Sequence, residues 1–173
     1  TRNERSFVVL LHVTVDGFLR HGSKRYRCAL GRGGVQAEKM EGDGVTPSGR
    51  YPLRRLLYRA DRLARPVSKL AMAEIHPDDG WCDAPADPAY NRPVNLPYRA
   101  STESMWREDS LYDLVLILGH NDDPIVPGAG SAIFMHVASP EYGPTEGCVA
   151  LARDDLLELL SDLDNNSEIK ITA

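Results

Sequence analysis

Short apolar runs alternate with polar, glycine-rich stretches along the chain, a pattern that is typical of a β protein. The Val- and Leu-rich segment 7–15 predicts a buried strand, and Asp16-Gly17 after it has the composition of a hairpin turn. Similar runs predict further strands over residues 25–30, 50–57, 113–119, 132–137 and 168–172.

One segment has helical periodicity instead. Leu156, Leu159, Leu160 and Leu163 share one face at helical spacing, which predicts an amphipathic helix over residues 154–163. A helical turn is also expected over residues 105–109.

Irregular structure is expected in three other places: the glycine-rich segment 31–49, the proline-rich excursion 60–100 and the hairpin loop 121–130. The predicted fold is mainly β, a sandwich or barrel-like sheet with one or more peripheral helices, in a single domain over residues 1–173.

Charge is distributed unevenly along the chain. Residues 1–73 hold 15 Lys and Arg against 6 Asp and Glu, whereas residues 74–173 hold 5 against 19. These segments either form two binding faces of opposite charge or pair with each other in the fold. Nucleic acid is not expected as a partner, because few aromatic residues accompany the basic stripe. The stripe consists of Arg50, Arg54, Arg55, Arg59, Arg62 and Arg65.

The three cysteines, Cys28, Cys82 and Cys148, have spacings that match no zinc motif, so neither a metal nor another cofactor is expected. Either all three are free thiols, or Cys28 and Cys82 form a disulfide and Cys148 stays free. No apolar run approaches the ~18 residues of a membrane helix, so no membrane-spanning segment is expected.

Two segments could carry chemistry: residues 130–136, which end in His136, and residues 144–151, which contain Cys148. A thiol nucleophile needs an imidazole to take its proton and backbone N–H groups to bind the oxyanion. His136 can be the base, and Gly147 and Cys148 can supply the amides. From these residues alone, an inert, buried Cys148 is the favoured interpretation.

The two segments resemble the L,D-transpeptidase catalytic domain, the YkuD family. In that family a histidine on a strand precedes a Ser/Thr-x-Gly-Cys loop, matched here by His136 and by the loop from Thr145 to Cys148. Residues 42–49 also resemble the family's G-x-x-x-T-P-x-G segment, and Tyr90-Asn91 and residues 121–124 resemble features of one bacterial branch. The resemblance extends from about residue 13 to the end of the chain.

This resemblance implies a function. Cys148 would attack a carbonyl of a peptidoglycan stem tetrapeptide, and the acyl group would pass to an amine of a second stem, forming a wall cross-link. His136 would be the base, oriented by the backbone carbonyl of Val137. A carbapenem would acylate Cys148. The substrate implies the periplasm or cell envelope, although the chain shows no signal peptide, and a monomer is expected.

The loop also departs from the family pattern. Many members have His where this chain has Glu146, and many have Arg where it has Ala150. Arg153 could replace that arginine or lie on the surface, and Glu146 could bind an amine or be solvated.

Thr145 and Tyr142 are further candidates for substrate binding, and Trp81, Tyr90 and Trp106 for the wall of a groove. Two alternatives stay open: an L,D-carboxypeptidase or other peptidoglycan hydrolase that uses the same Cys–His site, and a non-catalytic wall-binding module.

Overall fold

Short strands dominate residues 8–173, the part of the chain that the computed structural model describes. They are β1 (Leu10–Thr14), β2 (Phe18–His21), β3 (Lys24–Ala29), β4 (Val35–Gln36), β5 (Thr46–Pro47), β6 (Gly49–Tyr58), β7 (Met72–Glu74), β8 (Asp79–Cys82), β9 (Pro93–Asn95), β10 (Thr102–Ser104), β11 (Leu114–Leu118), β12 (Phe134–Val137), β13 (Val149–Leu151) and β14 (Glu168–Thr172). The helix α1 covers Arg153–Leu160. Phe7, the first residue of the first predicted strand, lies outside the described residues.

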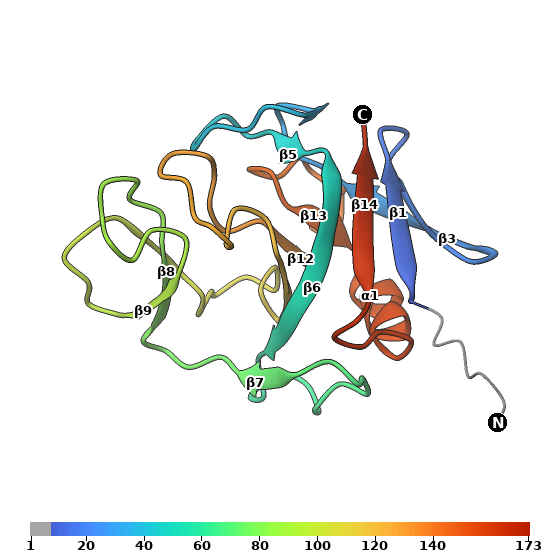
Figure 1. Ribbon diagram of the computed structural model, residues 1–173. Helices are drawn as coiled ribbons and strands as arrows, with labels where there is room; N and C mark the ends of the chain where they lie inside the picture. The colour runs from blue at the N-terminus through green and yellow to red at the C-terminus, as the bar shows by residue number, and fades with distance from the viewer. Residues whose placement is uncertain (1–7) are drawn as a thin grey trace, which may run out of the picture.

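The main sheet has nine strands in the order β11-β12-β13-β3-β2-β1-β14-β6-β7, and β11 also pairs with β6. This additional pairing closes the sheet on itself. It is possible because β6 has ten residues: its beginning pairs with β14, and its remainder pairs with β11 and β7. The result is a barrel-like sandwich (Figure 1), which confirms the predicted fold class.

The first and last described strands lie side by side. β14 pairs with β1 in parallel, with Leu10 opposite Glu168, and on its other edge it pairs with β6. Figure 1 shows the red β14 between the blue β1 and the teal β6. The C-terminal strand is therefore an internal member of the sheet.

Strand β11 separates two hydrophobic clusters. Its five residues are all buried. Leu114 and Leu116 belong to the larger cluster, against which α1 packs Leu156, whereas Val115 belongs to a second cluster around Phe134. Because neighbouring side chains of a strand point to opposite faces, an unbroken apolar run such as β11 is required where both faces are covered.

Two expectations about local structure are wrong. Residues 105–109 form bends and not a helical turn, because their carbonyl groups accept hydrogen bonds from arginine side chains. Arg59 donates to the carbonyl of Arg107 (2.7 Å), and Arg62 to that of Asp109 (2.6 Å). The excursion 60–100 is also more regular than expected, since it contributes β8 and β9 to a three-stranded sheet with β10.

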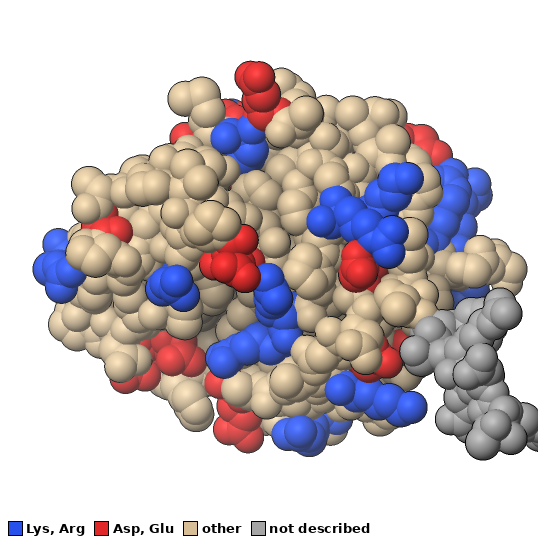
Figure 2. Space-filling view, viewed as in Figure 1, with Lys and Arg blue, Asp and Glu red and all other residues tan. Residues whose placement is uncertain are grey.

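The two oppositely charged segments pair with each other. Three arginines of the basic stripe bind carboxylates from the second segment: Arg50 binds Glu168 at 2.5 Å, Arg54 binds Asp122 at 2.9 Å, and Arg62 binds Asp113 at 2.8 Å. Basic and acidic side chains accordingly lie intermixed on the face in Figure 2. This pairing supports the second of the two interpretations of the charge pattern.

All three cysteines, Cys28, Cys82 and Cys148, are buried free thiols. The alternative in which Cys28 and Cys82 form a disulfide is therefore wrong. No helix in residues 8–173 is both long and apolar enough to cross a membrane.

Candidate active site

Cys148 immediately precedes β13, and its thiol is held by the segment that leads into β12. Its Sγ donates to the carbonyl oxygen of Ala132 at 3.3 Å and accepts from the backbone N–H of Phe134 at 3.4 Å. Only 7% of Cys148 is exposed. The thiol is thus fixed between one acceptor and one donor of the same backbone segment.

His136 lies on β12, and its ring is also fixed by the backbone. Nδ1 is 2.9 Å from the carbonyl oxygen of Val137, the contact expected from the sequence. A carbonyl oxygen can only accept, so Nδ1 carries the proton of the neutral ring and Nε2 keeps a free lone pair. The ring of Tyr112 packs edge-on against the imidazole, with centroids 5.3 Å apart. The imidazole of His136 can therefore accept a proton at Nε2.

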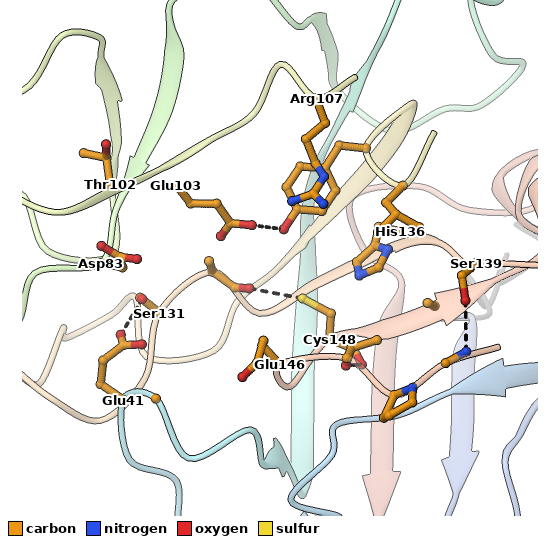
Figure 3. A pocket seen from close by; sticks show the side chains of 18 of the residues that line it. Glu41, Asp83, Thr102, Glu103, Arg107, Ser131, His136, Ser139, Glu146 and Cys148 are labelled. Atoms are coloured by element: carbon orange, nitrogen blue, oxygen red, sulfur yellow. Dashed lines mark hydrogen bonds between the residues drawn. The ribbon is translucent and has the colours of Figure 1, made fainter. Parts of the chain in front are cut away.

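The sheet brings these two residues to one cavity. β12 and β13 are parallel neighbours, with Met135 opposite Val149 and His136 opposite Ala150, so the residue before β13 lies near His136. Both side chains line a cavity of about 570 Å³. In Figure 3 the sulfur of Cys148 and the imidazole of His136 lie together at its centre.

Burial keeps both groups neutral. Burial raises the pKa of the Cys148 thiol to about 12, although the N–H of Phe134 and the ammonium of Lys39 act in the opposite direction. Burial also lowers the pKa of His136, although its bond to Val137 acts in the opposite direction. The resting pair is a thiol beside an imidazole, so the proton must move when the sulfur attacks.

The side-chain hydroxyl of Thr145 closes the loop that precedes Cys148. Thr145 Oγ1 donates to the carbonyl of Cys148 at 2.7 Å and accepts from the N–H of Gly147 at 3.1 Å. The expectation that the Gly147 amide is a free oxyanion donor is thus wrong for this conformation, because Thr145 already occupies it. The N–H of Cys148 has no acceptor among residues 8–173 and is the free amide.

Comparison with known proteins identifies the family of this chain. The family model of the L,D-transpeptidase catalytic domain, YkuD, matches residues 13–171. The chain belongs to this family. No curated protein matches the chain.

Solved structures that resemble this L,D-transpeptidase domain are distant in sequence. They include an L,D-transpeptidase from Mycobacterium tuberculosis H37Rv (10% identity, TM-score 0.48, 96% of this chain and 58% of that one). L,D-transpeptidase 3 from M. tuberculosis with a faropenem-derived adduct has 13% identity and a TM-score of 0.46, and the match covers 96% of this chain and 60% of that one. The helical cell shape determining protein Pgp2 from Campylobacter jejuni has 14% identity and a TM-score of 0.46, and the match covers 95% of this chain and 47% of that one. The chain spans about half to three-fifths of these structures' lengths.

Glu146 lies at the rim of the cavity, at the position where many family members have histidine. Its carboxylate accepts from Arg32 Nε at 3.0 Å, and the side chains of Glu146 and Arg32 are 76% and 50% exposed. The backbone of Arg32 also donates to the carbonyl of Thr145 at 2.8 Å. Arg32 therefore holds the nucleophile loop through both its backbone and its side chain.

Two of the predicted binding residues do not reach the cavity. Arg153 binds Asp113 at 3.3 Å and is absent from the cavity lining, so it does not replace the family's arginine. Tyr142 packs its ring under the guanidinium of Arg27, whose carbon lies 4.1 Å from the ring centroid, and Tyr142 is absent from the cavity lining. The candidate groove residues Trp81 and Trp106 are likewise absent from its lining.

Most of the cavity wall consists of residues that the sequence did not predict as part of a site. Glu41, Asp83 and Glu103 lie on one side of Cys148 in Figure 3, and His136 lies on the other. Tyr112 donates to Glu103, and burial raises the pKa of that carboxyl. These residues come from separate segments of the chain, and Glu103 lies on β10, so no local spacing in the sequence could have linked them.

A buried lysine also lines the cavity. The Lys39 side chain is 5% exposed, and its ammonium binds Asp43 at 2.6 Å. Within residues 8–173, no cluster of three or more His, Cys, Asp or Glu side chains could hold a metal ion.

Proposed function

We propose that the chain is a peptidoglycan L,D-transpeptidase that uses Cys148 as nucleophile and His136 as base. The observation that supports this most directly is the shared cavity, in which the Nε2 of His136 is free and its Nδ1 is tied to the carbonyl of Val137. The family assignment supplies the substrate class, the stem peptides of peptidoglycan.

Acylation of the enzyme is the first step. Cys148 Sγ forms a bond to the donor carbonyl carbon while its proton moves to His136 Nε2, and the free N–H of Cys148 binds the oxyanion. Collapse of the tetrahedral intermediate breaks the C–N bond. His136 returns the proton to the departing amine, and an acyl-thioester remains on Cys148.

Transfer to the acceptor repeats these steps in reverse. The amine of a second stem loses a proton to His136 as it attacks the thioester, and the proton then returns to the sulfur. Glu41, Asp83 and Glu103 make one wall of the cavity acidic, which suits a substrate with an ammonium group. If water replaced the amine, the same site would act as an L,D-carboxypeptidase.

Every group in this mechanism comes from a single chain, so we expect the enzyme to work as a monomer. Its substrate would place it in the periplasm or at the wall side of the envelope.

The test is mass spectrometry of stem tetrapeptides and disaccharide-peptides incubated with the wild-type protein and with Cys148→Ala. An acyl-protein and a cross-linked dimer, both lost in Cys148→Ala, would support transpeptidation. Tripeptide without dimer would show hydrolysis instead. A wild-type protein that neither turns over these substrates nor is acylated by a carbapenem at Cys148 would refute the proposal and favour a wall-binding module.

A further inference from the structure

Asn91 lies outside the cavity lining, yet its side chain uses its full hydrogen-bonding capacity next to the site. It is 6% exposed and has a φ of +57°, a conformation that asparagine tolerates better than most residues. Its Oδ1 accepts from Trp81 Nε1 and from the N–H of Ala132, each at 3.0 Å. Its Nδ2 donates to the carbonyl groups of His120 (3.2 Å) and Asn121 (2.8 Å).

These partners lie at both ends of one loop. His120 and Asn121 follow β11, and Ala132 precedes β12, so a single side chain from a third segment closes the loop that connects the two strands. Ala132 has a φ of +56°, which costs about 1–2 kcal/mol for a residue with a Cβ. The hydrogen bond from the Ala132 N–H to Asn91 helps to hold this unfavourable conformation.

The conformation of Ala132 determines where the thiol points. The carbonyl of Ala132 accepts from Cys148 Sγ at 3.3 Å, and two residues later the N–H of Phe134 donates to the same sulfur at 3.4 Å. A different backbone angle at Ala132 would turn this carbonyl away from the sulfur. Asn91 is thus connected to Cys148 through a single residue, Ala132, whose N–H bonds to Asn91 and whose carbonyl bonds to the thiol.

The neighbouring residue secures the same segment. Tyr90 accepts from the N–H of Gly130 at 3.0 Å and donates to Glu41 at 2.8 Å. Glu41 also accepts from the hydroxyl of Ser131 at 2.5 Å. Residues 130–132 are therefore held by two consecutive side chains.

We propose that Asn91 is a positioning residue for acylation, which holds Ala132 so that the Cys148 thiol is aimed at the substrate carbonyl. This inference rests on the proposed role of Cys148 as nucleophile. Alignment matters here because thiol and imidazole are both neutral, so proton transfer and attack must occur in one geometry. An error of about 1 Å in such a geometry can cost about 100-fold in rate.

The test compares Asn91→Gly with Asn91→Asp. Glycine keeps the positive φ and removes all four side-chain hydrogen bonds, whereas aspartate keeps both acceptor contacts and loses only the two donors. Asn95→Asp is the matched control, because Asn95 is exposed on the adjacent strand β9. Acylation of Cys148 by a carbapenem is followed by whole-protein mass spectrometry, with its rate constant and its amplitude recorded separately.

We expect the acylation rate constant of Asn91→Gly to fall at least about tenfold, with Asn91→Asp and Asn95→Asp within about threefold of wild type. A merely structural role would lower the amplitude through loss of folded protein and leave the rate constant unchanged, and that result would overturn the proposal. If Asn91→Gly does not fold, Asn91→Asp still tests the proposal, because aspartate keeps the acceptor for the N–H of Ala132. A tenfold lower acylation rate constant in Asn91→Asp would contradict a role that acts through Ala132.

The outcomes also separate this inference from the proposed function. A wild-type protein that is acylated but does not process stem peptides would count against stem peptides as substrate and leave this inference intact. A wild-type protein that is not acylated at all would overturn both.

Discussion

Replacing Gly147 with alanine should damage both the nucleophile loop and acylation. Gly147 has a φ of +132°, a region that residues with a Cβ rarely adopt. A Cβ there would lie 2.7 Å from the carbonyl oxygen of Val45 and 3.2 Å from Cδ1 of Ile133. Since the close atom belongs to the backbone, the loop has to move and cannot be relieved by a side-chain rotation.

The magnitude follows from two contributions. The strained φ costs about 1–3 kcal/mol, and the overpacking costs about 1–3 kcal/mol, so we expect a loss of about 3 kcal/mol of unfolding free energy. Because the displaced residue is adjacent to Cys148, the acylation rate constant should fall about 100-fold. Gly34→Ala is the matched control: its φ is +75° and nothing lies within 4 Å of the added Cβ. It should cost only about 1 kcal/mol.

Urea denaturation gives both free energies, and carbapenem acylation followed by mass spectrometry gives the rates. The reasoning would be refuted if Gly147→Ala were no less stable than Gly34→Ala, or if its acylation rate stayed within threefold of wild type.

Three further predictions concern side chains on the strands near the site. His136→Ala should slow carbapenem acylation at neutral pH by about 100-fold, because the thiol then has no base; an unchanged rate would disprove the pairing. Asp113→Asn should lower the unfolding free energy in urea by about 2 kcal/mol, because Asp113 is 2% exposed and binds both Arg62 and Arg153; a loss no larger than that of Arg153→Gln would contradict this. Burial lowers the pKa of His120 to about 4, so as the pH falls the histidine is protonated in the unfolded chain before it is protonated in the folded protein, and the free energy of unfolding decreases between about pH 6.5 and 4. Over this interval the free energy of unfolding of His120→Gln should therefore decrease by about 3 kcal/mol less than that of the wild type. The same pH dependence in both proteins would count against this prediction.

The sequence predicted those strands and helices that are determined by the hydrophobic pattern of their own residues. The apolar run of β11 and the leucine stripe of α1 each carry their own periodicity, and both were placed to within a few residues. The bends at residues 105–109 were not predictable, because arginine side chains from the segment after β6 satisfy their carbonyl groups.

The same distinction holds for the site. The motif residues His136 and Cys148 were identified because each lies in a short, recognisable segment, and the parallel pairing of β12 with β13 brings both to one cavity. Glu103 and Tyr112 were missed, since their relation to Cys148 depends on how strand β10 and the segment before β11 pack beside it. Arg153 was misplaced for a similar reason, because its carboxylate partner, Asp113, lies far away in the sequence.

The internal position of β14 has a consequence for how the protein is made. Residue 168 pairs with residue 10 on one edge and with residue 52 on the other, so one edge of β1 and one edge of β6 stay unpaired until residues 168–172 are available. During synthesis on a ribosome these two strand edges therefore stay open until β14 has been made. Contacts this distant in sequence slow folding and leave those edges open to other chains. Until β14 inserts between β1 and β6, these two edges are where the unfinished sheet can pair with another chain.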